Sequence, residues 1–223
     1  AQAINGESPG IVAEWCAELG IPIVHYSTAY VFSGEGTRPW QEDDETGPLS
    51  AYGRTKLSGE QKVATAGPKH LILRTSWVYD AYGKNFVRTM LKLGKEREQL
   101  TIVADQRGAP TYAPHLAQAT LEALESATRQ KPFRGCIYHL CNQGETSWFE
   151  FAEAIFQLAR AAGVPLKVSS LELIPTSAYP TPAQRPLNSR LDLDKAKKVL
   201  NVKLPDWRKG LEACMPLVVK EYL

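Results

Sequence analysis

Two residues, Tyr52 and Lys56, have the types and the spacing needed to move a proton. They stand four residues apart in the segment SAYGRTKLSGE (50–60), and positions at this spacing share one face of a helix. A free tyrosine has a pKa of about 10. A cation a few ångströms away favours the phenolate and lowers this pKa towards the range in which a phenol can act as acid or base. The pair therefore predicts proton transfer to or from an alcohol or ketone oxygen.

Two hydroxyl side chains precede this pair. Ser27 and Thr28 end an apolar segment that predicts a buried strand, and either hydroxyl can hydrogen-bond the same reacting oxygen. The interval of about 25 residues before Tyr52 fits a strand, a loop and the start of a helix. A tyrosine and a lysine at this spacing also occur by chance on solvated helices. The strand and the hydroxyls favour a catalytic Ser/Thr–Tyr–Lys set, which suits a reaction in which a hydride moves at the neighbouring carbon.

The composition indicates a globular protein and excludes two classes of function. The chain has 223 residues, of which 43% are hydrophobic and 22% charged. A formal net charge of +2 gives no basic field of the kind that nucleic-acid binding needs. No apolar stretch reaches the roughly 18 residues of a membrane span, and the N-terminal residues lack the order of a signal peptide. We therefore expect neither a nucleic-acid partner nor a membrane partner.

The four cysteines do not predict a metal centre. Cys136, His139 and Cys141 lie close in sequence, but on a strand Cys136 points away from the other two. Neither a C-x-x-C motif nor a spaced histidine pair is present, and His25, His70, His115 and His139 are scattered. Free cysteines are among the most buried residue types. We interpret all four as reduced core thiols of a cytoplasmic protein, with no metal ligands.

Helical and buried-strand patterns alternate along the chain, which is typical of an α/β protein with a parallel sheet covered on both faces. Ser50 is placed to cap the helix that carries Tyr52 and Lys56. The acidic run 42–45 predicts a solvated loop without chemistry. The expected helices cover 8–19, 50–66, 84–95, 114–128, 147–161, 192–200 and 206–221, and the expected strands cover 21–27, 69–78, 100–104, 136–141 and 166–173.

A dinucleotide site of this architecture normally has a glycine-rich turn between its first strand and helix, where the pyrophosphate binds. The one candidate here is the segment that contains Gly34, Gly36 and Pro39. Proline occupies its third position, and an acidic loop follows in place of a helix. We interpret this segment as a turn.

Several segments resemble the extended short-chain dehydrogenases, and more narrowly the family of dTDP-4-dehydrorhamnose reductases. They follow the family's order over nearly the whole chain, and the last is specific to these reductases. They are VHYSTAYVF (24–32), PWQE (39–42), PLSAYGRTKLSGE (48–60), LRTSWVY (73–79), Asn85 with Phe86, DQRGAPT (105–111) and PTSAYPTPAQRPLNSR (175–190).

The resemblance implies NADPH- or NADH-dependent reduction of a dTDP-linked 4-keto sugar, dTDP-4-dehydro-6-deoxy-L-mannose. Tyr52 would donate the proton to the C4 oxygen, Lys56 would hold the nicotinamide ribose and lower the pKa of the tyrosine, and Thr28 would bind the reacting oxygen. It also implies a fold: a Rossmann-like doubly wound parallel sheet, incomplete at its N-terminal side, within residues 1–105, and a smaller α/β substrate-binding region within 106–223. In some relatives a magnesium ion lies at a subunit contact, so a homodimer is compatible with the resemblance, although no magnesium ligands can be assigned.

Further residues are candidates for binding the two ligands. An indole at the carboxyl end of a buried strand suits packing against a sugar or nicotinamide face, and an arginine in a proline-rich loop suits a diphosphate. The cofactor candidates are Ser27, Tyr52, Lys56, Thr75 and Ser76, and the substrate candidates are Trp77, Asn85, Gln106, Arg185 and Asn188.

The chain departs from the family in two places. Members begin with a further segment that carries G-x-x-G-x-x-G, and this sequence starts near the family's Val-Asn segment, represented by Ile4 and Asn5. We therefore expect the 223 residues to bind NADPH weakly and to expose a sheet edge and apolar helix faces. Ala29 stands where the family usually has aspartate, so we expect an aspartate there to raise turnover.

Two alternatives to the reductase remain open. A nucleotide-sugar epimerase or dehydratase shares the tyrosine and the lysine but recycles its cofactor, and the segment 175–190 disfavours it. A non-catalytic binding or regulatory subunit of the same fold is favoured by Ala29 and by the missing glycine-rich segment. The intact Tyr52 and Lys56 oppose that second alternative.

Overall fold

The computed structural model describes residues 1–223 and divides them into two compact units. Unit 1 consists of Ala1–Ser76, Ala117–Cys141 and Pro182–Leu204, and unit 2 of Trp77–Leu116, Asn142–Thr181 and Pro205–Leu223. Each unit therefore combines segments that lie far apart in the sequence. The functional division at residue 105 expected from the resemblance stays a prediction.

A parallel sheet forms the centre of unit 1. Its strands are β1 (Ile23–Thr28), β2 (His70–Thr75) and β7 (Cys136–His139), in the order β1-β2-β7. Every residue of the central strand β2 is buried, as a strand covered on both faces requires. The register pairs Thr28 with Thr75, so the carboxyl ends of β1 and β2 lie side by side.

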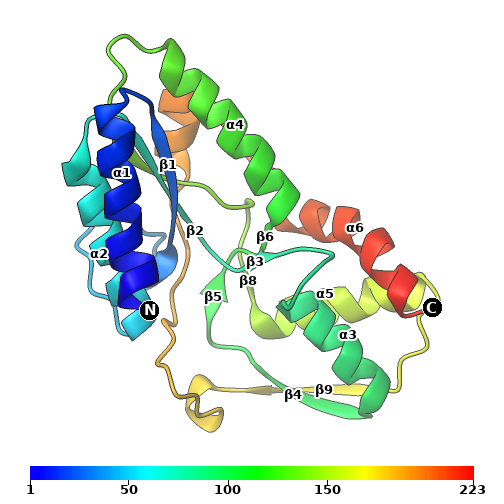
Figure 1. Cartoon of the computed structure of the whole chain (residues 1–223). Helices are drawn as coiled ribbons and strands as arrows, with labels where there is room; N and C mark the ends of the chain where they lie inside the picture. The colour runs from blue at the N-terminus through cyan, green and yellow to red at the C-terminus, as the bar shows by residue number, and fades with distance from the viewer. The chain divides into compact units, whose positions relative to one another are not determined.

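Helices cover both faces of this sheet. The helices α1 (Ser8–Glu18) and α2 (Ala51–Ala66) pack together, and the π-helical turn η1 (Ala3–Glu7) precedes α1 (Figure 1). Successive residues of β1 point to opposite faces: His25 meets α2 through Lys56, whereas the hydroxyl of Tyr26 bonds Thr120 of α4 (Ala113–Arg129). This arrangement confirms the parallel α/β fold with helices on both faces.

Unit 2 is built from short strand pairs and three helices. The parallel pairs are β3 (Val78–Tyr79) with β6 (Thr111–Tyr112) and β4 (Gln99–Val103) with β9 (Ser170–Ile174). An antiparallel pair joins β5 (Arg107–Gly108) to β8 (Thr146–Ser147). The helices α3 (Phe86–Glu96), α5 (Trp148–Ala161) and α6 (Trp207–Val218) surround a core in which Leu91, Phe151, Phe156 and Trp207 are fully buried.

The remaining elements are short. They are the 3₁₀ turns η2 (Ala29–Val31), η3 (Thr176–Ala178) and η5 (Val219–Glu221) and the π-helical turn η4 (Ala196–Leu200). The helix expected over 192–200 is therefore shorter than predicted. Helical backbone begins at Asp194, where the Asp192 carboxylate caps it by accepting from the Asp194 backbone N–H, and Asn201 ends it with a positive φ of 56°.

One edge of the unit 1 sheet is open. The strand β1 pairs with β2 alone, so the backbone groups along its other edge have no strand partner. Beside it, α1 exposes apolar side chains, among them Trp15 at 62% and Leu19 at 73% of their full accessibility. The expected exposure of a sheet edge and an apolar helix face is thus confirmed. No helix of the chain is long and apolar enough to cross a bilayer.

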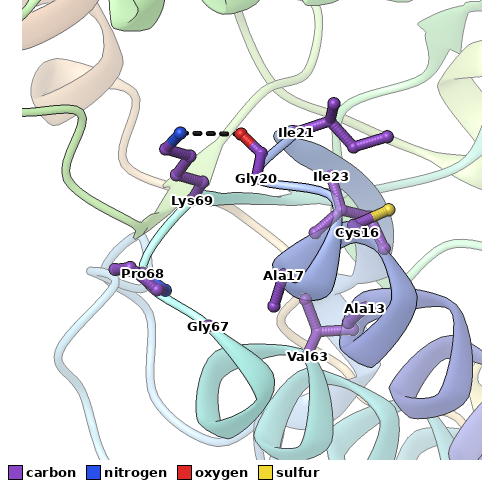
Figure 2. A pocket seen from close by; sticks show the side chains of 10 residues that line it. All are labelled: Ala13, Cys16, Ala17, Gly20, Ile21, Ile23, Val63, Gly67, Pro68 and Lys69. Atoms are coloured by element: carbon purple, nitrogen blue, oxygen red, sulfur yellow. Dashed lines mark hydrogen bonds between the residues drawn. The ribbon is translucent and has the colours of Figure 1, made fainter.

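A small pocket lies between the last turns of α1 and α2, beside the start of β1. Figure 2 shows its lining, in which Ala13, Cys16 and Ile23 face Val63, and Lys69 donates a 2.7 Å hydrogen bond to the Gly20 carbonyl. The pocket adjoins the amino end of β1, whereas Ser27 and Thr28 stand at its carboxyl end. The lining is mostly apolar and contains no acid–base pair, so we assign it no chemistry.

Candidate active site

Hydroxyl groups gather where β1 and β2 end. Ser27, Thr28 and Thr75 are buried, and Ser27 Oγ and Thr75 Oγ1 have no hydrogen-bond partner within the protein. Buried polar atoms are nearly always paired, so these two groups are available to a polar ligand. Ser76 differs, because it hydrogen-bonds the buried Cys141 thiol. In open α/β sheets, ligands bind at the carboxyl ends of strands.

The first turn of α2 presents Tyr52 to these hydroxyls. Ser50 caps the helix as expected and accepts a hydrogen bond from the backbone N–H of Gly53. A Cβ on Gly53 would lie 2.2 Å from the Tyr30 carbonyl oxygen, so glycine is required for this close approach. The Thr28 hydroxyl accepts from the backbone N–H of Tyr30 at 3.2 Å and lies close enough to the Tyr52 hydroxyl to lower its pKa, and the Tyr30 ring meets the Tyr52 ring edge-on at 6.2 Å. The predicted contact between the tyrosine and the threonine is therefore present.

Lys56 lies one turn after Tyr52 and points towards β1. Its Nζ donates a 2.6 Å hydrogen bond to the Tyr26 carbonyl and lies 3.4 Å from His25 Nε2. Burial lowers the pKa of Lys56, and the charge of Glu60 partly opposes this. The ammonium is thus fixed by the strand that also carries Ser27 and Thr28.

The expected effect of Lys56 on the tyrosine is not met in this structure. Burial raises the pKa of Tyr52 above its usual value, and the lowering contribution comes from the Thr28 hydrogen bond. The reason is geometric, since the lysine ammonium is directed to the backbone of β1. The Tyr52 side chain nevertheless keeps 47% of its accessibility, so a ligand can reach it.

Sequence reasoning missed a chain of hydrogen bonds that leads from Asn5 through Thr55 to the backbone of Tyr52. Asn5 Nδ2 donates to Thr55 Oγ1 at 3.2 Å, and the Thr55 hydroxyl donates to the Tyr52 carbonyl at 3.0 Å. Asn5 belongs to the π-helical turn η1, and such turns are frequent at functional sites. A Cβ on Gly59 would lie 2.1 Å from the Asn5 carbonyl oxygen, so η1 and α2 are in close contact. The two glycines of α2, Gly53 and Gly59, both mark close backbone contacts and were the available signal.

A buried ion pair was also missed. Arg74 of β2 binds Glu60 of α2 with Nε–Oε1 and Nη2–Oε2 distances of 2.9 and 2.7 Å, and the side chains are 3% and 2% exposed. Arg74 also donates to the Glu42 carbonyl, and the Glu42 carboxylate accepts from the backbone N–H of His139. The interpretation of Glu42 as part of a solvated acidic run was therefore wrong, because this residue fixes its loop to the sheet.

The proline-rich loop within residues 175–190 brings two substrate candidates, Arg185 and Asn188, into unit 1. Asn188 is 1% exposed, and its amide donates to the Arg38 carbonyl at 2.8 Å and accepts from Arg190 Nε at 2.8 Å. These bonds hold the loop and occupy the amide. Arg185 is exposed, and its charge lowers the pKa of Tyr30, which places it on the Tyr52 side of the unit.

The other substrate candidates lie in unit 2. Trp77 stacks on Trp148 with ring centroids 3.8 Å apart, and its indole N–H is buried without a partner. Its φ of 47° is strained for a bulky residue, and such strain clusters at functional sites. Gln106 accepts from the Trp148 indole at 3.0 Å, so both candidates meet around a tryptophan that sequence reasoning missed. Asn85 caps α3 by accepting from the backbone N–H of Arg88.

Two further expectations concern glycines and metals. Gly34 and Gly36 lie in irregular loop backbone with φ of 76° and 73°, as the turn interpretation requires. A Cβ on Gly34 would lie 2.1 Å from Pro186, so this turn packs closely on the proline-rich loop. No group of three or more His, Cys, Asp or Glu side chains in residues 1–223 is arranged to hold a metal ion.

The surroundings of Ala29 change the expectation for an aspartate at this position. Ala29 is completely buried, at 0% exposure, directly after Thr28. We expect Ala29→Asp to lower the free energy of unfolding by about 1–3 kcal/mol, because a buried carboxylate without a partner loses its hydration. Burial would raise the folded-state pKa of this aspartate, so the penalty is full at pH 7 and shrinks as the pH falls. Urea unfolding at pH 7 and pH 5 measures this.

Ala29→Asn is the matched control, because it has the same shape without the charge. Its stability relative to the parent protein should not change between the two pH values. Equal stability of the two variants at pH 7, together with a higher turnover of Ala29→Asp, would contradict the prediction and show that the carboxylate finds a polar partner.

The comparisons with known proteins agree with this geometry. Residues 1–219 match the model of the RmlD substrate binding domain. The dTDP-4-dehydrorhamnose reductase of Escherichia coli K12 is 48% identical over 212 residues, which cover 95% of this chain and 71% of that protein. The reductase of Burkholderia thailandensis is 47% identical over 220 residues, covering 96% and 74%.

A solved structure gives the same result. The dTDP-4-dehydrorhamnose reductase of Bacillus anthracis, crystallised in complex with NADP, superposes with a TM-score of 0.87 at 35% identity, covering 97% of this chain and 73% of the other. This match confirms the Rossmann-type α/β fold, and the identities extend through both units. The chain belongs to the dTDP-4-dehydrorhamnose reductase family.

Proposed function

We propose that the chain carries the proton-transfer centre of an NAD(P)H-dependent reductase. The reaction is reduction of the C4 ketone of dTDP-4-dehydro-6-deoxy-L-mannose to the alcohol of dTDP-L-rhamnose. The proximity of the Thr28 and Tyr52 hydroxyls carries the proposal, because it places a donor and a second hydroxyl at one point at the end of β1. Membership of the reductase family supports the substrate class.

Each group at this point has one task. The Tyr52 hydroxyl donates its proton to the C4 oxygen, and the Thr28 hydroxyl holds that oxygen in place. The nicotinamide, when bound, supplies the hydride that adds to C4. Lys56 keeps one N–H beyond the two directed at β1, and this donor suits a ribose hydroxyl.

The residues present fit a nicotinamide cofactor. Ser27 Oγ and Thr75 Oγ1 are buried polar atoms without protein partners at the sheet end where the cofactor is expected. Ser76, held by Cys141, stands next to Thr75 and is proposed to line the same site. The reductase of B. anthracis was crystallised with NADP, which supports this cofactor class. No carboxylate cluster supports magnesium, so we assign it no site, and a homodimer stays a prediction.

Each unit, taken by itself, carries candidates for substrate binding. Arg185 is the candidate for the diphosphate, because its guanidinium is exposed and lies on the Tyr52 side of unit 1. In unit 2, Trp77 is the candidate for the sugar or nicotinamide face, with Gln106 and Asn85 as polar neighbours. Asn188 acts mainly by holding the loop that carries Arg185.

An assay of NADPH oxidation with the dTDP-linked 4-keto sugar tests the proposal, using the natural protein at its full length. A reductase oxidises one NADPH for each ketone reduced. An epimerase or dehydratase gives product without net oxidation, and a regulatory subunit binds the ligands without turnover. Either of these results would contradict the proposed reduction.

The 223 residues alone should bind NADPH weakly. They provide the nicotinamide end of a site, but no glycine-rich turn followed by a helix offers backbone donors to the pyrophosphate. Calorimetry on this chain should give a dissociation constant above the micromolar range. Micromolar or tighter binding would show that another device holds the phosphates, and the exposed Arg185 would be the first residue to replace.

A further inference from the structure

Lys56 points towards β1, where the His25 imidazole offers it an uncharged hydrogen-bond acceptor. Lys56 Nζ has three N–H donors. One goes to the Tyr26 carbonyl at 2.6 Å, and a second is directed at His25 Nε2, 3.4 Å away. We propose that His25 is a positioning residue for Lys56: its neutral Nε2 accepts from the ammonium and, with the Tyr26 carbonyl, leaves one N–H for the ligand.

The fold builds a place for this imidazole. His25 lies on the face of β1 that is turned to α2, and Gly59 of α2 stands opposite it. A Cβ on Gly59 would lie 3.6 Å from His25 Nε2, an ordinary van der Waals distance, so the ring lies directly against this part of α2. The Asn5 carbonyl of η1 closes the same spot, because it lies 2.1 Å from that Cβ position. The ring is therefore held between a strand and a helix, close to the lysine.

The charges around His25 explain why a neutral acceptor suits this position. The charge that acts on His25 is that of Lys56 on α2, Glu60 of the same helix acts on Lys56, and η1 contributes only a backbone carbonyl. The charge of Glu60 is directed to Arg74 in the buried ion pair. A carboxylate at position 25 would pair with Lys56 and neutralise its charge, whereas an imidazole anchors the ammonium and leaves its charge available to the ligand.

The protonation state of His25 agrees with this role. Burial and the charge of Lys56 lower the pKa of His25 to about 4, so the imidazole is neutral at pH 7. For Nε2 to accept, the single ring proton must be on Nδ1. The contact of 3.4 Å is long for a hydrogen bond, and catalytic hydrogen bonds commonly shorten when ligands bind.

Nuclear magnetic resonance on this chain tests the proposal without any turnover. The ¹⁵N shifts of His25 should show the proton on Nδ1, and the titration of the Lys56 side chain should depend on residue 25. In His25→Phe the pKa of Lys56 should fall, because an acceptor that stabilises the ammonium is lost. It should return towards the parent value in His25→Gln, whose amide oxygen accepts, and rise in His25→Glu.

A His25 proton on Nε2, or an unchanged Lys56 titration in a folded His25→Phe variant, would overturn the proposal. The tautomer is read in the unmodified chain, so the first outcome does not depend on any variant folding. His70→Phe is the matched control, since His70 bonds the Gly67 carbonyl outside the site and its replacement should leave the Lys56 titration unchanged.

The consequence for rate rests on the proposed function and is measured separately in the full-length natural protein. His25→Phe should lower kcat/KM about 10-fold, the effect of losing one hydrogen bond to a charged group, and His25→Gln should restore most of it. If the parent protein shows no reduction, the proposed function fails while the resonance result still stands. If the parent reduces the sugar and His25→Phe has the same kcat/KM, the positioning role fails.

Discussion

Tyr52→Phe should reduce ketone reduction at least 100-fold in the full-length natural protein. The substitution removes the hydroxyl that lies beside Thr28 and is proposed to donate the proton. A positioned acid or base contributes about 10²–10⁴-fold to the rate. The ring remains, so its edge-on contact with Tyr30 and the fold should be kept. Initial rates of NADPH oxidation at saturating cofactor measure the effect.

Tyr82→Phe is the control for the loss of a phenolic hydroxyl. Tyr82 is exposed in unit 2, and its backbone carbonyl, not its hydroxyl, accepts from Asn85, so its variant should keep the parent rate. The proton-donor role is excluded if Tyr52→Phe retains activity within tenfold of the parent protein. Equal melting temperatures of the two variants would show that any loss is chemical.

Glu60→Gln should lower the free energy of unfolding by about 3–5 kcal/mol, the usual effect of breaking a buried ion pair. The change leaves the Arg74 guanidinium buried without its carboxylate, with the Glu42 carbonyl and the Phe32 ring as its remaining partners. Because Glu60 joins the helix of Tyr52 and Lys56 to β2, turnover should fall as well. Urea unfolding followed by circular dichroism measures the stability.

Two further variants separate charge from packing. Glu125→Gln breaks an exposed pair with Arg129 and should hardly change the stability. The double variant Glu60→Met, Arg74→Met should recover a large part of the loss, because apolar side chains of similar length can replace a buried pair. A Glu60→Gln variant as stable as Glu125→Gln would show that water reaches the Arg74 site.

Much of the fold could be predicted from the sequence because local signals agreed with the tertiary structure. The apolar run before Ser27 gave β1, and Ser50 marked the start of α2, which ends at Ala66 as expected. Cys136 to His139 form a strand, as the alternation of faces required. The helix over 192–200 was predicted slightly too long because Asp192 lies outside the helix and caps its start with its carboxylate.

The site was predictable where spacing determines contact and unpredictable where the fold brings distant residues together. The i, i+4 rule placed Tyr52 and Lys56 on one face, and the strand end placed Thr28 beside them. No spacing rule connects His25 to Lys56 or Asn5 to Thr55, because these contacts depend on the pairing of β1 with α2 and of η1 with α2. Trp148 could not be predicted for the same reason, because its contact with Trp77 also joins residues that are distant in the sequence.

The interleaved composition of the two units has a consequence for synthesis and cleavage. The chain passes from one unit to the other after Ser76, Leu116, Cys141, Thr181 and Leu204. Unit 1 therefore cannot finish folding before residue 204 has left the ribosome, and unit 2 also needs residues 205–223. Neither unit corresponds to a continuous gene fragment, and a protease that cuts one connection cannot separate them. Both units should reach their native state late in translation and close together in time.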